Sequence, residues 1–200
     1  MFKIGFMYVQ KELSLEHQLS SITDSELIKQ ASAGDSEAFS ELYSRYVERI
    51  YNYVYYRTSN ANDAEDLTAR VFHRAYKHIK NYKEKGYPFS AWLYRIAHNL
   101  VANWYRDNKR KQEIALDDSL PLVSNKNQPE KSVIKMEEQE ALMDAIKQLP
   151  MERQELLVLK FIEPLTNAEI AMIMGRSEGA IKSLYHRTLN SLRDILTEEK

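Results

Sequence analysis

Hydrophobic residues along most of the chain recur every three or four positions, the spacing that gathers them on one face of an α-helix. This pattern predicts helices over 24–33, 36–56, 63–81 and 90–111, with Asp63 available to cap the third. The apolar stripe of the fourth helix consists of Trp92, Leu93, Ile96, Leu100 and Trp104. Only five Gly and five Pro occur among 200 residues, which favours helices over a turn-rich β architecture. We therefore expect an all-α fold.

Two interruptions of the helical pattern indicate loops. The first follows Tyr82, where Gly86 loosens the backbone and Pro88 biases the residue before it toward extended geometry. The second covers 117–130, which contains two prolines and several turn formers but no helical period. This composition is typical of a linker between domains.

The second loop divides the chain into two small helical domains joined by a flexible linker, whereas the first loop lies inside the first domain. We expect a loose N-terminal extension over 1–22, a first domain over 23–112, an acidic linker over 113–131 and a second domain over 132–200. Helices resume near Lys131, and Pro150 is placed for the first turn of one of them.

The second domain carries the signals of a helix-turn-helix. Residues 166–169 fit a capping box, and Ser177 can cap the last helix. A small Ala171 lets two helices cross closely, Gly175 permits the turn, and Ile181 closes the core between them. The same signals also fit an αα-hairpin without a DNA role. The outward side of the last helix, however, offers donors suited to phosphates and base edges: Lys182, Ser183, His186, Arg187 and Asn190.

Charge is distributed unevenly, although the formal net charge is only −1. Residues 70–111 contain eleven Lys and Arg against two acidic residues, and 112–155 contain ten acidic residues against five basic ones. Basic side chains interleaved with aromatic ones, as between Tyr82 and Lys111, suit single-stranded or melted DNA. Trp92 and Trp104 also lie at helical spacing, so either one can instead be a core residue.

Several function classes are excluded or disfavoured. The chain has no cysteine, which excludes disulfides, thiolate zinc sites and a cysteine nucleophile and makes the cytoplasm the natural compartment. The apolar opening over 1–9 is too short for a signal peptide, and no run reaches the roughly 20 apolar residues of a membrane span. No Gly-rich phosphate loop, nucleophile elbow or histidine–carboxylate spacing is present. We expect no catalytic residues, no metal and no cofactor.

Three segments in order resemble the extracytoplasmic-function (ECF) sigma factors of the sigma-70 family. They are 64–76 (AEDLTARVFHRAY), 89–99 (FSAWLYRIAHN), and Leu149-Pro150 followed by 165–183 (LTNAEIAMIMGRSEGAIKS). The resemblance extends over 24–196 and implies a cytoplasmic, bacterial alternative sigma factor. Such a protein binds core RNA polymerase and directs promoter-specific transcription initiation by recognising −35 duplex and by melting and capturing −10 DNA.

The resemblance assigns residues of the first domain to two partners. The helix around 63–76 would dock on the clamp helices of the polymerase β′ subunit, through Asp63, Asp66, Leu67 and Phe72. Ala69 and Arg70 stand where Gln and Glu are common in the family. Loop 81–87 corresponds to the family's specificity loop, which takes a flipped base, and Asn99 falls where an asparagine helps to hold that base. The full set expected at the −10 element is Tyr82, Lys83, Lys85, Tyr87, Asn99, Trp104 and Arg106.

In the second domain the resemblance implies that the helix-turn-helix reads the −35 element. The expected contacts are Arg176, Lys182, Ser183, His186 and Arg187, while Leu184 stands where Arg is common. The acidic linker would run toward the polymerase active-site channel and the RNA exit path. The β flap of the polymerase and an anti-sigma protein are the other expected partners.

Two other function classes fit parts of the sequence. A conventional helix-turn-helix regulator with a sensing or dimerising N-terminal domain leaves the basic stretch 70–111 without a purpose. An adaptor or inhibitor that binds polymerase without reading DNA leaves the outward Lys182, His186 and Arg187 unexplained.

Overall fold

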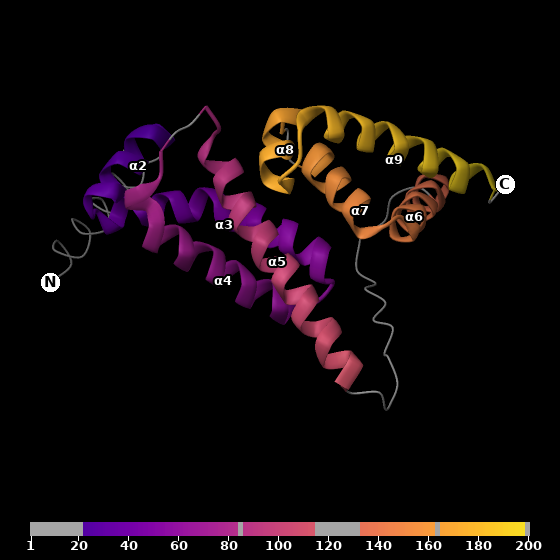
Figure 1. The fold of residues 1–200 in the computed structure, drawn as a ribbon, viewed down its shortest axis with the longest axis horizontal. Helices are drawn as coiled ribbons and strands as arrows, with labels where there is room; N and C mark the ends of the chain where they lie inside the picture. Colours follow the sequence, from indigo (N-terminus) through magenta and orange to yellow (C-terminus); the bar gives the residue numbers. More distant parts are fainter. Residues whose placement is uncertain (1–21, 84–85, 115–132, 163–164, 199–200) are drawn as a thin grey trace, which may run out of the picture. The chain divides into compact units, whose positions relative to one another are not determined.

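The computed structural model describes residues 22–83, 86–114, 133–162 and 165–198, and it describes side chains within 22–108, 141–161 and 165–197. All regular structure in these residues is helical, which confirms the predicted fold class (Figure 1). The chain divides into two compact units, the first ending at Val101 and the second beginning at Ala102. The predicted extension over 1–22 lies almost wholly outside the described residues, as do Lys85 and most of the predicted linker.

Four elements build the first unit. They are α2 (Asp24–Ala33), α3 (Ser36–Thr58), α4 (Ala61–His78) with a 3₁₀ turn η1 (Ile79–Asn81), and α5 (Phe89–Ile114), which continues past the unit boundary. α3 packs against both α2 and α4. Their apolar faces meet in a core whose fully buried members include Leu27, Leu42, Ile50, Val54, Leu67, Val71, Leu93 and Ala97. Burial of such side chains supplies the main free energy of folding.

The helix starts are set by polar caps. Asp35 Oδ1 accepts from the backbone N–H groups of Glu37 at 2.9 Å and Ala38 at 3.2 Å, and so caps α3. At α4 the cap is Asn60, whose Oδ1 accepts the N–H of Asp63 at 3.1 Å. The prediction that Asp63 caps this helix was therefore wrong. Asn60 has the extended backbone that a cap requires, and α4 begins two residues earlier.

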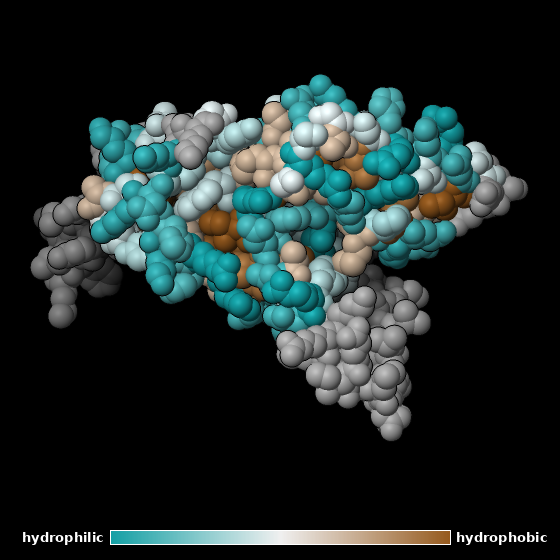
Figure 2. Space-filling view, viewed as in Figure 1, coloured by the Kyte–Doolittle hydropathy of each residue, from teal (hydrophilic) through white to brown (hydrophobic). Residues whose placement is uncertain are grey.

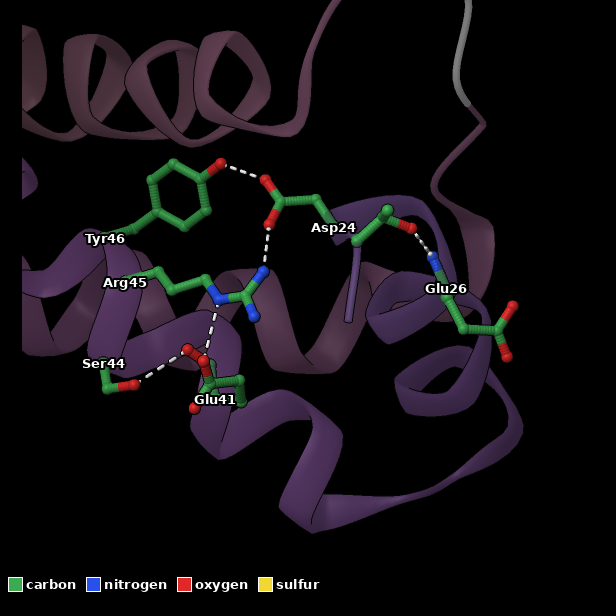
Figure 3. Close-up of polar contacts among 7 residues, drawn as sticks. Asp24, Glu26, Glu41, Ser44, Arg45 and Tyr46 are labelled. Atoms are coloured by element: carbon green, nitrogen blue, oxygen red, sulfur yellow. Dashed lines mark hydrogen bonds and ion pairs between the residues drawn. The ribbon is translucent and has the colours of Figure 1, made fainter. Parts of the chain in front are cut away.

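A polar network fastens α2 to α3 (Figure 3). Asp24 accepts a hydrogen bond from the Tyr46 hydroxyl and pairs with Arg45 Nη1 at 2.8 Å, and Arg45 Nε reaches Glu41 Oε1 at 2.8 Å. Burial, together with the hydrogen bond to Asp24, raises the pKa of Tyr46 well above its ordinary value. Tyr46 therefore stays protonated and keeps donating.

The second unit contains α6 (Val133–Gln148), α7 (Met151–Leu157), a π turn η2 (Val158–Ile162), α8 (Asn167–Met174) and α9 (Glu178–Glu198). A small cluster of Ala145, Leu149, Leu157 and Leu192 packs α6, α7 and α9 together. Pro150 stands at the N-cap of α7, just before the first turn in which it was predicted. Nothing in the sequence pattern predicts the π turn.

Candidate nucleic-acid interfaces

The predicted helix-turn-helix consists of α8, the turn at Gly175 and α9. Thr166 and Glu169 form the capping box, since each side chain accepts the other's backbone N–H, at 3.2 and 2.6 Å. Gly175 is left-handed with φ 67°, and Ser177 Oγ accepts the N–H of Ala180 at 3.2 Å. Ala171 and Ile181 are buried between the helices. These cap and turn predictions are confirmed.

α9 has one buried and one exposed face. The buried face carries Ile181, Leu184, Thr188 and Leu192, and the Thr188 hydroxyl donates to the Leu184 carbonyl at 2.8 Å. The exposed face carries the predicted contacts Lys182, Ser183, His186 and Arg187, and Arg176 is exposed at the turn. On the side of the molecule drawn in Figure 2, mostly hydrophilic residues cover α9. The structure therefore brings the whole predicted −35 set to the surface of one helix and its turn.

Two cations of this set are held by carboxylates of the same unit. Arg176 Nη2 forms an ion pair with Glu152 of α7. Lys182 Nζ lies 2.9 Å from Glu178 Oε1, one helical turn earlier on α9. Neither carboxylate was singled out in the sequence. Glu152 is 24 positions from Arg176 and on another helix, so the sequence gives no signal for this pair, whereas the spacing of four between Glu178 and Lys182 is a signal that could have revealed the other.

A surface hollow of about 270 Å³ opens between α4 and α5. It is lined by Arg74, His78, Trp92, Ile96 and Asn99. Asn99 was predicted as a site residue and is exposed here, while Trp92 is half-buried. Arg74 and His78 were not predicted. Their spacing of four places them on one face of α4, but spacing alone does not reveal that this face borders α5.

An aromatic cluster surrounds Tyr82 beside this hollow. The Tyr82 ring centroid lies 4.9 Å from that of Trp92 and 5.6 Å from that of Phe89, and Tyr46 packs against Phe89 at 5.6 Å. The Tyr82 hydroxyl donates to the Tyr87 carbonyl at 3.3 Å. Tyr82 and Tyr87 are both half-buried, so a structural role accounts for much of their surface.

The remaining predicted −10 residues fall on different surfaces. Lys83 is exposed at the start of the loop. Arg106 is exposed seven positions after Asn99, hence on the same face of α5, and its Nη2 donates to Asn103 Oδ1 at 3.0 Å. Trp104 packs edge-on against Tyr105 at 4.8 Å and points to another side of the helix. The structure thus groups Arg106, but not Trp104, with Asn99.

The residues predicted to bind polymerase separate into buried and exposed ones. Leu67 is 1% and Phe72 4% exposed, and both pack in the core of the first unit. Their side chains offer almost no surface to a partner. Asp63 is half-buried, whereas Asp66 is exposed with its Oδ2 3.6 Å from Arg70 Nη1.

A groove of about 320 Å³ runs between α3 and α4 near these residues. It combines apolar and aromatic walls with two carboxylates. The lining residues are Tyr43, Val47, Glu48, Tyr51, Glu65, Thr68 and Ala69. Within the described part of the chain, no group of His, Asp and Glu side chains has the arrangement of a metal site, and no helix is long and apolar enough to cross a membrane.

Comparisons with known proteins agree with this arrangement. The family description "Sigma-70 region 2" matches residues 42–111, and "Sigma-70, region 4" matches 139–192. The ECF RNA polymerase sigma factor BldN of Streptomyces coelicolor is 37% identical over 174 residues, which are 87% of this chain and 66% of that relative. The ECF RNA polymerase sigma factor SigW of Bacillus subtilis is 32% identical over 181 residues, covering 86% of this chain and 95% of SigW.

Solved structures share the fold at low sequence identity. CnrH, solved in complex with the cytosolic domain of CnrY, matches with a TM-score of 0.64 at 21% identity. The match covers 88% of this chain and 99% of the CnrH chain. The sigma factor RpoE of Bartonella quintana, in complex with the anti-sigma factor NepR, has a TM-score of 0.66 at 20% identity and covers 81% of this chain and 98% of that one.

Proposed function

The chain belongs to the ECF sigma factors of the sigma-70 family, and we propose that its two units divide promoter recognition between duplex reading and the capture of melted DNA. As a member of this family it is a non-enzymatic subunit that directs promoter-specific transcription initiation with RNA polymerase. The proposed domains are region 2 over 23–112 and region 4 over 132–200, with the linker between them.

The second unit reads the −35 element as duplex. An α-helix with its side chains is about 10–12 Å wide and enters a major groove of about 12 Å. α9 presents Lys182, Ser183, His186 and Arg187 on one exposed face, next to the turn from which Arg176 projects. Arg and Lys donate to phosphates and guanine edges, and Ser and His add shorter donors or acceptors.

The first unit captures a base of the melted −10 element in the hollow between α4 and α5. Extruding a base costs a few kcal/mol, and stacking on an aromatic side chain is worth about 1–3 kcal/mol per base. The hollow offers the half-buried Trp92 ring for stacking, the Asn99 amide for a base edge, and Arg74 for a phosphate. Lys83 and Arg106 extend the cationic surface for the strand on either side.

Core RNA polymerase docks across the groove between α3 and α4. The exposed Asp66 beside Arg70 and the groove carboxylates Glu48 and Glu65 give this surface polar contacts. Tyr43 and Tyr51, which also line the groove, add aromatic ones. An anti-sigma factor is a second proposed partner, because RpoE of Bartonella quintana, which shares this fold, was solved in complex with the anti-sigma factor NepR. The cytoplasm, where the polymerase works, is the proposed location, and the linker is proposed to enter the polymerase channel.

The observation that supports this division most strongly is the separation of two DNA-compatible surfaces on two compact units. Asn99→Ala and Arg187→Ala test it, each in holoenzyme reconstituted with core polymerase on a promoter selected by run-off transcription. Asn99→Ala removes one or two hydrogen bonds of about 1 kcal/mol each, so open-complex formation should fall about five- to thirtyfold while closed-complex affinity stays unchanged. A pre-melted template should recover part of the loss.

Arg187→Ala should instead weaken closed-complex formation and leave opening of the bound complex intact. A base-edge contact would cost about 1–3 kcal/mol, and a phosphate contact would lower the salt slope by about one. Arg193→Ala, an exposed arginine farther along α9, is the matched control. If each variant loses closed-complex affinity and opening equally, the proposed division of labour is wrong.

A further inference from the structure

Glu152 and Glu178 occupy the duplex-reading surface together with the cations that they neutralise. We propose that these two carboxylates are specificity-determining residues, which suppress binding of α9 to DNA of the wrong sequence. This inference rests on the proposed role of α9 in reading duplex DNA. Both carboxylates are partly exposed and lie outside the apolar core.

Glu152 fixes Arg176 from a different helix. Glu152 lies in the first turn of α7, and Arg176 follows the left-handed Gly175 at the end of α8. The two side chains are 41% and 43% exposed, so the pair is accessible to DNA. An arginine carries five N–H donors in a rigid fork, and an ion pair at Nη2 leaves others directed elsewhere. Arg176 can therefore keep Glu152 while it donates to a base edge.

Glu178 restrains Lys182 within α9. The pair has the i, i+4 spacing with the carboxylate on the N-terminal side, which is the favourable orientation on a helix. Glu178 also lies in the first turn of α9, where the helix dipole favours a negative charge. Among the described side chains, Arg187 has no ion pair and instead donates its Nε to the Ser183 carbonyl at 3.4 Å. The surface thus has restrained and unrestrained cations.

These ion pairs lower the affinity for DNA of the wrong sequence more than the affinity for the matched sequence. Binding to any sequence depends on cations that neutralise phosphates and release counterions. Arg176 and Lys182 can contribute fully only by leaving their carboxylates, which then lie near the phosphates and are repelled. A matched sequence adds base-edge contacts from the same surface, and these offset the repulsion. The carboxylates therefore lower non-specific affinity and raise the ratio of specific to non-specific binding.

The test compares Glu152→Gln, Glu178→Gln and the double variant in holoenzyme. Binding is measured to the promoter and to the same template with a scrambled −35 element, from 50 to 200 mM salt. Asp144→Asn is the control, because it frees Lys147 from an exposed ion pair of 2.7 Å on α6, a helix that carries none of the proposed DNA contacts. Melting temperature is followed in all variants to separate folding from recognition.

Each Gln variant should bind the scrambled template about three- to tenfold more tightly, and promoter affinity should rise less. Each freed cation adds about one phosphate contact, so affinity for the scrambled template should fall by a further factor of about 3.5 between 50 and 200 mM salt. The inference is overturned if the scrambled template is bound as by the wild type, if promoter affinity rises equally, or if Asp144→Asn has the same effect. Failure of the proposed function is distinguishable, because Arg187→Ala would then leave promoter binding unchanged.

Discussion

We predict that Ile181→Ala removes most of the stability of the helix-turn-helix and leaves the first unit intact. Ile181 is 0% exposed and lies on the face of α9 that also buries Leu184 and Thr188. α9 packs against α8, α7 and α6, so its apolar face is shared by the whole second unit. Shortening Ile181 leaves a cavity there, because close-packed neighbours relax only in part.

The size of the effect follows from the size of the unit. An Ile→Ala change in a core costs about 2–5 kcal/mol. A single core in fewer than about 80 residues, such as the helices from Val133 to Glu198, rarely supplies more than about 3–5 kcal/mol. A unit of about 4 kcal/mol that loses about 3 is unfolded in roughly one molecule in six at 25 °C. Ile181→Val costs only about 0.5–1.5 kcal/mol and should leave the unit folded.

Amide hydrogen exchange of the full chain measures this directly. The protected amides of α8 and α9 should lose about 3 kcal/mol of opening free energy, whereas those of α3 and α4 keep theirs. Leu142→Ala is the matched control, because Leu142 on α6 is a large exposed side chain in the same unit. A loss below about 1 kcal/mol in α9 would refute the role of Ile181 in closing this core. An equal loss in α3 would refute separate unfolding of the two units.

Two further predictions concern polar contacts. Tyr46→Phe removes the hydrogen bond to Asp24 and should lower the free energy of unfolding of the first unit by about 1–2 kcal/mol below pH 10, with Tyr43→Phe as a nearly neutral control. Because the pKa of Tyr46 is raised in the folded state, its contribution to stability is complete below about pH 10 and is lost as the pH rises through the raised pKa. Denaturant titrations at pH 8–11 should therefore show a narrowing difference in unfolding free energy between variant and wild type. A constant difference would contradict this assignment. Thr166→Ala removes the cap from α8 and should cost about 1 kcal/mol, measured as faster amide exchange of α8; unchanged exchange would show that Glu169 alone secures the helix start.

The sequence predicted most of the helices because their ends carry local signals. α2 begins and ends where the pattern placed it, and the capping box and the left-handed Gly175 were found where expected. The start of α4 was misplaced because both Asn60 and Asp63 have capping side chains. The choice between them depends on backbone geometry near the left-handed Ser59, which the sequence does not express.

The candidate sites were predicted less completely because they depend on which helix faces meet. Asn99 was found through a motif, but Arg74 and His78 enter the hollow only because α4 lies beside α5. The motif also does not distinguish residues that contact a partner from residues that pack in the core. Leu67 and Phe72 match the family and are buried, so their types are explained by the core without any partner.

Two departures from the family pattern have different consequences because one is buried and the other exposed. Leu184, where Arg is common, lies in the core between α8 and α9, so a charged side chain there would lose hydration and the apolar residue stabilises the unit. Arg70 is exposed and holds Asp66 at 3.6 Å, an ion pair that contributes little to stability in water. Its effect is therefore on the charge of the exposed surface of α4, where it adds a positive charge and partly neutralises Asp66. The first change therefore affects the stability of the second unit, whereas the second alters only the charge of an exposed surface.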